Sequence, residues 1–87
     1  MEKTLFSTGG DNLRTILSAA RRRAGLTQAE LARRLDLPQP FVSHIERGER
    51  RVDVVEFYAI ALALEIDPVE LFTKFIRLLD EERGQAE

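Results

Sequence analysis

The chain has 87 residues, enough for one domain with a single small core and too few for a separate catalytic or ligand-sensing domain. It contains no cysteine and only one histidine, His44, which excludes disulfides and thiolate zinc sites and disfavours a metal cluster or a Ser/His/Asp triad. We therefore expect no enzyme, no cofactor and no small-molecule ligand. The N-terminus lacks the apolar run of a signal peptide, and no stretch approaches the roughly 18 apolar residues of a membrane span, so we expect a cytoplasmic protein without membrane contact.

Charge is unevenly distributed along the chain. The net charge is -2, from 13 basic and 15 acidic residues. Residues 14 to 51 include nine arginines against four acidic residues, whereas residues 52 to 87 include three basic residues against nine acidic ones. Because the planar, forked guanidinium suits phosphate groups and base edges, the first block is a candidate anion-binding surface. The plainer alternative is a solvated charged surface.

Five helices are predicted from apolar spacing and cap signals. Apolar residues at helical spacing predict a first helix that follows a cap at Asp11 and ends before Gly25. A capping box pairs an N-cap side chain with a carboxylate three residues later, and each satisfies a free backbone N–H at the helix start. Three such boxes occur, at 27–30, 53–56 and 67–70.

These signals predict further helices over 28–35, 37–48, 54–64 and from 68 to about 82. The helix over 54–64 is apolar nearly all round, so we expect it to be central and buried. The predicted fold class is all-α, a compact five-helix bundle.

Only Asp36, Leu37 and Pro38 separate the second and third predicted helices, a spacing typical of a helix-turn-helix. The run QAELARRLDLPQPFVSHIERG, residues 28–48, resembles the XRE family of bacterial regulators, the lambda-repressor-like group that includes phage repressors and Cro proteins. The likeness extends over about residues 13–72. It implies a small Ala32 where the two helices touch, and inward-facing side chains at Leu31, Leu35, Leu37, Val42 and Ile45.

The resemblance suggests three regions along the chain. They are an N-terminal arm over 1–11, a helix-turn-helix DNA-binding domain over 12–74, and a C-terminal helix extension with a tail over 75–87.

The resemblance also implies that the third helix enters the major groove of double-stranded DNA. Gln39 then matches the glutamine that reads a base, since a glutamine amide can bond adenine N6 and N7 together. The residues that the resemblance assigns to base contacts are Gln39, Pro40, Ser43 and His44. Those assigned to the DNA backbone are Gln28, Phe41, Arg47, Arg50, Arg51 and Arg22. The plainer alternatives are an exposed helix former for Gln28, an ordinary surface residue for His44 and packing against its own domain for Phe41.

A structural ion pair between Arg21 and Glu46 is a further implication of the resemblance, since the family pairs an arginine late in the first helix with a glutamate late in the third.

Three departures from the family pattern affect the helix ends. Asp36 and Glu65 stand where glycines are usual, and Pro38 stands where a serine cap is common. Aspartate tolerates the left-handed conformation better than most residues do, and glutamate less well.

One such domain reads about half of a site, so the family usually binds a palindrome as a two-fold dimer. The last predicted helix has an apolar stripe longer than packing on one small bundle requires. We expect these residues to form the dimer contact: Phe72, Phe75, Ile76 and Leu79. The alternative is that they belong to the ordinary intramolecular core.

The resemblance thus implies a homodimeric, sequence-specific DNA-binding transcriptional regulator, a repressor or an autoregulator, that reads a palindromic operator. Within that class the sequence does not separate a stand-alone repressor, a restriction-modification controller and an antitoxin with a partner protein on the acidic C-terminal half. An alternative from another class is a protein-interaction module that keeps the fold without DNA binding, since the net charge is negative and the third helix begins with Pro-Gln-Pro.

Overall fold

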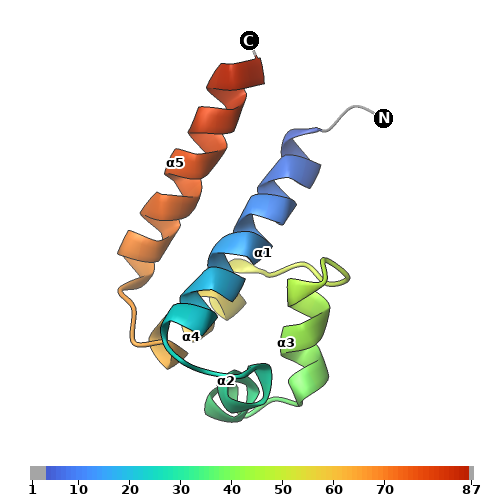
Figure 1. Ribbon diagram of the computed structural model, residues 1–87, viewed down its shortest axis with the longest axis vertical. Coiled ribbons are helices and arrows are strands. Elements are labelled where there is room, and N and C mark those ends of the chain that lie inside the picture. Colours follow the sequence, from blue (N-terminus) through green and yellow to red (C-terminus); the bar gives the residue numbers. More distant parts are fainter. Residues whose placement is uncertain (1–3, 87) are drawn as a thin grey trace.

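The computed structural model describes residues 4–86, and within this range the chain forms five α-helices and no strand (Figure 1). The helices are α1 Leu5–Arg23, α2 Gln28–Leu35, α3 Gln39–Glu46, α4 Val54–Ala63 and α5 Pro68–Ala86. The predicted all-α class is confirmed. None of these helices combines the length and the apolar character that a membrane crossing requires.

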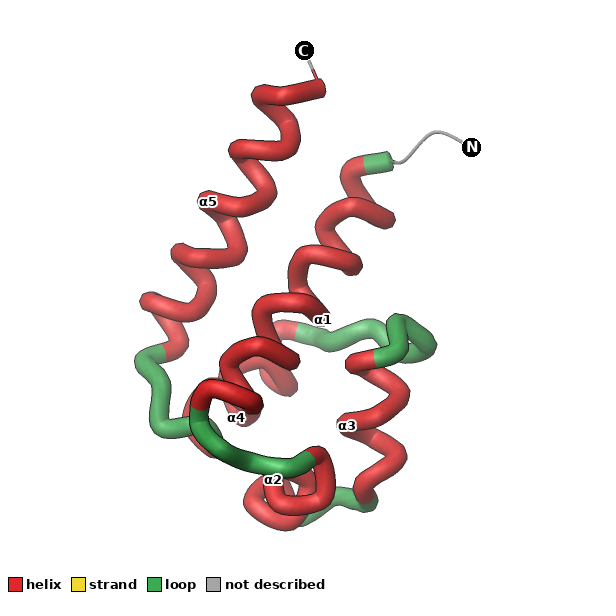
Figure 2. The backbone as a smooth tube through the Cα atoms, in the orientation of Figure 1, coloured by secondary structure: helices red, strands yellow, loops and turns green. Residues whose placement is uncertain are grey.

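The two long helices, α1 and α5, lie side by side and antiparallel, so that the start of α1 and the end of α5 are at the same end of the molecule (Figure 2). The three short helices gather around the other end of α1, where α2 packs on both α3 and α4. The core draws on all five helices. Its buried apolar residues are Leu17, Ala20, Leu31, Ala32, Val42, Ile45, Phe57, Ile60, Ala61, Leu64 and Leu71.

Four helices end in the same way, with one left-handed residue followed by a backbone bond to the carbonyl five residues earlier. Glycine takes the left-handed position after α1 and α3, whereas Asp36 takes it after α2 with φ 58° and Glu65 after α4 with φ 60°. The closing bonds run from the Leu37 N–H to the Ala32 carbonyl at 3.0 Å and from the Ile66 N–H to the Ala61 carbonyl at 2.9 Å. Asp36 and Glu65 therefore close α2 and α4 with the same geometry that Gly25 and Gly48 give to α1 and α3.

Helix starts agree with the predicted capping boxes at two of three positions. The boxes of Thr27 with Glu30 and of Asp53 with Glu56 form in full. At α5 a single bond from the Val69 N–H to the Asp67 carboxylate, at 2.8 Å, replaces the reciprocal pair. Helix α3 has Pro38 at its N-cap and no side-chain cap, as the sequence predicts.

The predicted start of the first helix is wrong. Helix α1 begins at Leu5, where Thr4 and Ser7 form a capping box, and Asp11 lies within it. Residues 5–11 of the expected arm therefore belong to a helix, while residues 1–3 lie outside the described part of the chain. Gly9 and Gly10 weaken the local helix signal by about 1 kcal/mol each. Packing beside α5 compensates, since a Cβ on Gly9 would stand 3.9 Å from Leu79.

The expectation that the fourth helix is central and buried is also wrong. Only one side of α4 packs inward, and the exposed fractions of Val54 and Leu62 are 75% and 52%. Leu37, expected to face inward, is 41% exposed in the turn between α2 and α3. In a domain of only five helices no helix is enclosed on every side, so α4 covers α2 and α5 on one side and faces outward on the other.

Replacing Glu65 by glycine should stabilise the fold, because an L-residue pays about 1 to 2 kcal/mol in the left-handed conformation and part of the gain is offset by the flexibility of glycine in the unfolded chain. We expect a net gain of about 0.5 to 1 kcal/mol in the free energy of unfolding in urea. The matched control is Glu65→Ala, which removes the exposed 3.6 Å pairing with Arg34 but keeps a Cβ. A glycine variant no more stable than the alanine variant would contradict this account.

Candidate nucleic-acid interface

Helix α3 presents one face to the core and the other to the outside. Val42 and Ile45 are buried, whereas Gln39, Pro40 and His44 are exposed. Ser43 lies between them, half-buried, and its hydroxyl donates to the Pro40 carbonyl at 3.3 Å. The four residues predicted to contact bases therefore share one outward side of a short helix, which α2 supports from behind.

A buried ion pair joins α1 to the end of α3. The Arg21 guanidinium donates through Nε to one Glu46 oxygen at 2.7 Å and through Nη2 to the other at 2.9 Å. Its third group, Nη1, donates to the Leu26 carbonyl at 2.7 Å. Only 10% and 8% of the Arg21 and Glu46 side chains are exposed. The family resemblance names both partners of this ion pair. The two parallel hydrogen bonds between them fix the orientation of the guanidinium and of the carboxylate.

The same carboxylate organises two glutamines. Gln28 Nε2 donates to Glu46 at 2.9 Å, and Gln28 Oε1 accepts a bond from Gln39 Nε2 at 3.3 Å. A chain of hydrogen bonds thus runs from Arg21 through Glu46 and Gln28 to the first residue of α3. The family likeness assigned Gln28 to a phosphate, and its amide is already engaged inside the protein.

Two further residues of this network were missed by sequence reasoning. The Ser18 hydroxyl donates to Glu46 at 3.5 Å, and Arg14 Nη1 donates to the Glu46 carbonyl at 3.2 Å. Arg14 also packs against Gly48, just beyond α3. The signal was available in the spacing, because Arg14, Ser18 and Arg21 recur every three or four residues and so share one face of α1.

The network sets the ionisation of Glu46. Burial by itself would raise the pKa of this carboxyl, but the hydrogen bonds from Arg21 and Gln28 and the charges of Arg21 and Arg22 outweigh it, so the pKa lies below its ordinary value. The hydrogen bond to Glu46 likewise raises the pKa of Arg21. Both groups are therefore charged at neutral pH.

Arg50 and Phe41 contact each other, although the family resemblance assigns both residues to the DNA backbone. The Arg50 guanidinium lies 4.5 Å from the centroid of the Phe41 ring and donates two bonds to the Glu56 carboxylate, at 2.9 and 2.7 Å. This bond lowers the pKa of Glu56 and raises that of Arg50. Phe41 is half-buried and packs against the core, in agreement with the plainer alternative that it packs against its own domain.

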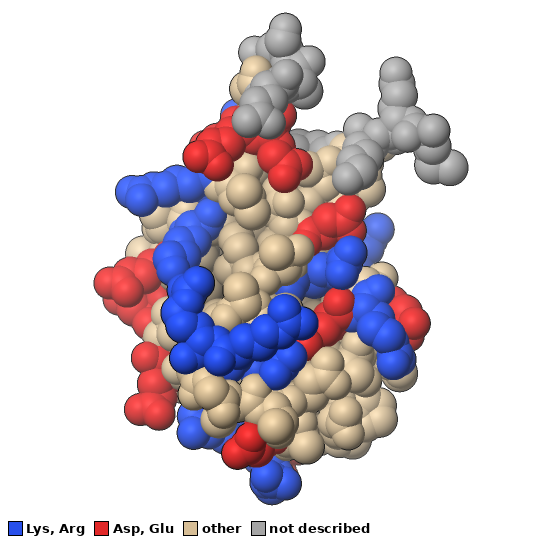
Figure 3. Space-filling model, in the orientation of Figure 1, with Lys and Arg blue, Asp and Glu red and all other residues tan. Residues whose placement is uncertain are grey.

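The other predicted backbone-contact arginines point outward. Arg22 and Arg51 are exposed, and Arg47 pairs with Glu49 at 3.1 Å on the surface. Basic side chains form a band over α5 and α1 on the face seen in Figure 3, with acidic groups at its margins. The protein therefore offers exposed cations in spite of its negative net charge.

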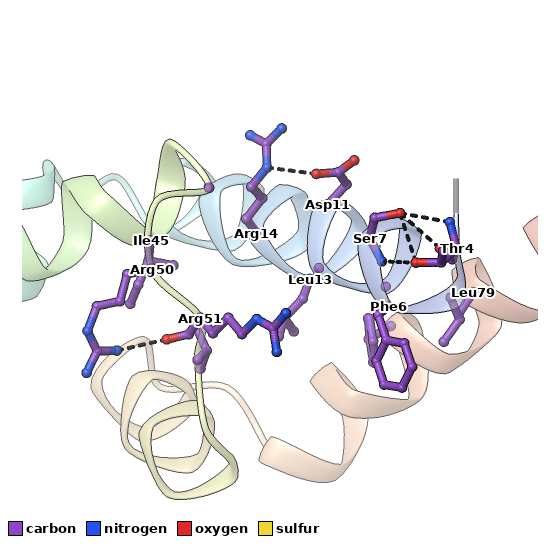
Figure 4. A pocket seen from close by; sticks show the side chains of 15 residues that line it. Thr4, Phe6, Ser7, Asp11, Leu13, Arg14, Ile45, Arg50, Arg51 and Leu79 are labelled. Carbon is purple, nitrogen blue, oxygen red and sulfur yellow. Dashed lines mark hydrogen bonds and ion pairs between the residues drawn. The ribbon is translucent and has the colours of Figure 1, made fainter. Parts of the chain in front are cut away.

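An open groove of about 610 Å³ lies between the first half of α1, the loop after α3 and the side of α5. Figure 4 shows the Arg51 side chain extending over this groove, whereas Arg50 points away from it. Leu13, Phe75 and Leu79 contribute its apolar lining. The described residues contain no cluster of His, Cys, Asp or Glu suited to a metal ion.

The predicted dimer residues separate into two pairs. Phe72 and Ile76 are 42% and 41% exposed on the outer side of α5, while Phe75 and Leu79 are half-buried and border the groove beside α1. The Phe72 ring meets Phe57 of α4 edge-on, with centroids 5.7 Å apart. Of the four residues, Phe72 and Ile76 expose the most apolar surface.

Removing one member of the buried ion pair should be costly. We expect Arg21→Ala to lower the free energy of unfolding by about 3 kcal/mol or more near pH 7, because Glu46 is left buried and charged without its partner. Urea denaturation checks this. The double variant Arg21→Met/Glu46→Met should be more stable than Arg21→Ala, since it buries no lone charge. Equal stability of Arg21→Ala and the wild type would contradict the argument.

The ion pair should also give the fold a defined dependence on pH. A carboxylate whose folded pKa is lowered stabilises the fold above its unfolded pKa, and this contribution is lost as the pH falls through the folded pKa. The stability difference between the wild type and Glu46→Gln should therefore be largest near pH 7 and begin to shrink below about pH 4. A difference independent of pH from 7 to 3 would contradict it. Urea denaturation at several pH values provides the measurement.

Comparison with known proteins identifies the family. The family model described as helix-turn-helix matches residues 17–71. An uncharacterized HTH-type transcriptional regulator, y4dJ, from Sinorhizobium fredii (strain NBRC 101917 / NGR234) is 43% identical over 53 residues, covering 61% of this chain and 69% of the relative.

Solved structures agree with this match. The XRE-family like protein from Pseudomonas syringae pv. tomato str. DC3000 is 41% identical with a TM-score of 0.79, over 84% of this chain and 89% of that chain. The restriction-modification controller C.AhdI from Aeromonas hydrophila is 35% identical with a TM-score of 0.66, over 71% and 94% of the two chains. The controller C.Esp1396I, solved as a tetramer with its natural 35 base-pair operator, is 26% identical with a TM-score of 0.75, over 90% and 97%. The chain belongs to the XRE family of helix-turn-helix transcriptional regulators.

Proposed function

We propose that this protein is a transcriptional regulator that binds a palindromic operator as a homodimer, with α3 of each copy in the major groove. The observation that carries the proposal is the hydrogen-bonded chain from Arg21 to Gln39. It fixes a base-reading side chain at the exposed start of a short helix. A helix serving only as a protein scaffold would not require an oriented glutamine there.

The geometry of Gln39 suits an adenine. One N–H of its amide donates to Gln28, which leaves the second N–H and Oε1 to face outward. Adenine presents an acceptor at N7 and a donor at N6 in the major groove, and this pair matches the two remaining functions of the amide. His44 is exposed one turn after Pro40 and supplies a second group for base edges.

Exposed arginines supply the sequence-independent part of binding. Arg22, Arg47 and Arg51 are exposed and charged, and each phosphate contact formed on binding releases counterions. We propose Arg51 as the principal contact of the loop after α3, since the partners of Arg50 lie within the protein. Because the side-chain amide of Gln28 is engaged within the protein, its contribution to phosphate binding is the backbone N–H at the start of α2.

The second copy meets the first through the outer side of α5. Phe72 and Ile76 there are 42% and 41% exposed and share one side of the helix with Val69, which is 73% exposed, so together they offer apolar surface to a second copy. C.Esp1396I, solved as a tetramer on its operator, supports the use of this fold as more than one copy. A restriction-modification controller is the second candidate function, favoured by the likeness to C.Esp1396I and C.AhdI.

Base reading is tested by Gln39→Ala. We expect the variant to lose about 5- to 150-fold in affinity for the DNA upstream of its own coding region, because a bidentate base contact is worth about 1 to 3 kcal/mol. Affinity for random duplex of the same length should change little. Fluorescence anisotropy at fixed salt measures both.

Arg51→Ala is the companion variant. It should weaken both duplexes alike and reduce the slope of log affinity against log salt by about two units, because the homodimer loses one phosphate contact from each copy. Wild-type protein that binds upstream and random DNA equally, and that selects no sequence from a random duplex pool, would overturn the proposed function in favour of the protein-interaction module.

Ile76→Lys tests the dimer. The charge on the outer side of α5 should shift the protein toward monomer in sedimentation equilibrium and weaken operator binding, while the thermal midpoint of the diluted protein changes little because Ile76 is 41% exposed. Thr73→Lys, at an exposed polar position of the same helix, is the control. An unchanged assembly state in Ile76→Lys would place the contact elsewhere.

A further inference from the structure

The first turn of α3 lacks a usual means of support. Pro38 at the N-cap makes no side-chain hydrogen bond to the free N–H groups of this turn. A helix start without a side-chain cap frays more readily than a capped one. Yet this turn holds Gln39, which the proposed function assigns to a base edge. The hydrogen bond from Gln39 to Gln28 positions that side chain, and a second contact supports the turn itself.

That support comes from across the loop between α3 and α4. Phe41 is the third residue of α3, and its ring lies between the core and the Arg50 guanidinium. The guanidinium in turn is held by both oxygens of Glu56, the third residue of α4. We call these three residues the Phe41–Arg50–Glu56 clamp.

The far end of the clamp is itself fixed. Glu56 accepts the Asp53 N–H at 2.9 Å in the capping box that begins α4, and Asp53 accepts the Glu56 N–H at 2.7 Å. Arg50 Nη1 also donates to the Arg51 carbonyl at 2.9 Å, which closes the loop on itself. The start of α4 therefore anchors Arg50, and Arg50 anchors Phe41.

We propose that Arg50 is a positioning residue for base reading: through Phe41 it holds the first turn of α3, and it does not serve as a phosphate contact. This inference rests on the proposed function, because it assigns Arg50 a role in sequence discrimination. Its neighbour Arg51 differs, since its side chain extends over the groove (Figure 4), and no hydrogen bond or ion pair engages that side chain among residues 4–86. Two adjacent arginines thus have separate tasks.

Lysine at position 50 separates the two roles. A lysine keeps the positive charge but cannot donate two parallel bonds to a carboxylate while stacking flat on a ring. Arg50→Lys therefore removes the clamp and leaves a charge for a phosphate. Arg51→Lys is the matched control at the neighbouring position. Glu56→Gln is a second route to the same loss, because its amide oxygen can still accept the Asp53 N–H of the capping box.

The first measurement needs no DNA. Hydrogen exchange by NMR on the full chain should show the Phe41 and Val42 amides exchanging at least about tenfold faster in Arg50→Lys and Glu56→Gln, with the Phe41 ring resonances shifted. Amides of α5 should exchange as in the wild type, as should all amides of Arg51→Lys. Unchanged exchange at the start of α3 in both clamp variants would overturn the proposal, whatever the protein does with DNA.

The second measurement uses a duplex selected by the wild-type protein from a random pool, with random duplex beside it. Arg50→Lys should lose about tenfold or more in affinity for the selected duplex, keep its affinity for random duplex, and keep the wild-type salt slope. If Arg50→Lys binds the selected duplex like the wild type while Arg50→Ala lowers the salt slope by about two units, as the loss of one phosphate contact from each copy of the dimer does, Arg50 touches phosphate and the proposal is wrong. Failure of the wild type to select any duplex would instead sink the proposed function, and the exchange measurement then decides the clamp alone.

Discussion

One buried carboxylate, that of Glu46, determines how the helix-turn-helix is held together. It accepts hydrogen bonds from Arg21 and Ser18 of α1 and from Gln28 of α2 while standing on the last turn of α3, so three helices meet at two oxygen atoms. The free-energy cost of removing such a charged group from water offsets much of the attraction that it gains from its partners. The benefit of the network is therefore geometric: α3 has one orientation in which all these bonds form together.

The arrangement of α3 follows from its length. Eight residues at about 1.5 Å each give a helix about 12 Å long, too short to be stable on its own, so its contacts must define both its existence and its direction. Val42 and Ile45 fix its depth in the core, and Glu46 fixes its last turn. Its first turn depends on Gln28 on one side and on the ring of Phe41 on the other. A binding site built on so short a helix needs rigid support of this kind.

Most local signals were readable from the sequence, whereas a long-range contact was reached only through the family likeness. The boxes at Thr27 and Asp53 lie within four residues, and both form. The family likeness named Arg21 and Glu46, which are 25 residues apart and which no local pattern connects. The start of α1 escaped prediction because two glycines conceal a helix that is stabilised by α5. The exposure of α4 escaped because apolar periodicity reports what a helix can bury and not which neighbours are present to cover it.

The arginines show why composition alone overstates a charged surface. Among the nine in residues 14 to 51, five have guanidinium groups that donate to carbonyls or carboxylates of the same chain, namely Arg14, Arg21, Arg34, Arg47 and Arg50, and the Arg50 group also lies over a ring. Because hydrogen-bonded guanidinium groups have fixed positions, they can hold a helix, whereas the exposed Arg22 and Arg51 side chains are able to follow a phosphate backbone. A net charge of -2 is then no obstacle to binding an anion, since acidic residues concentrate in the second half of the chain. What matters is which cations remain outward once the fold has engaged the others.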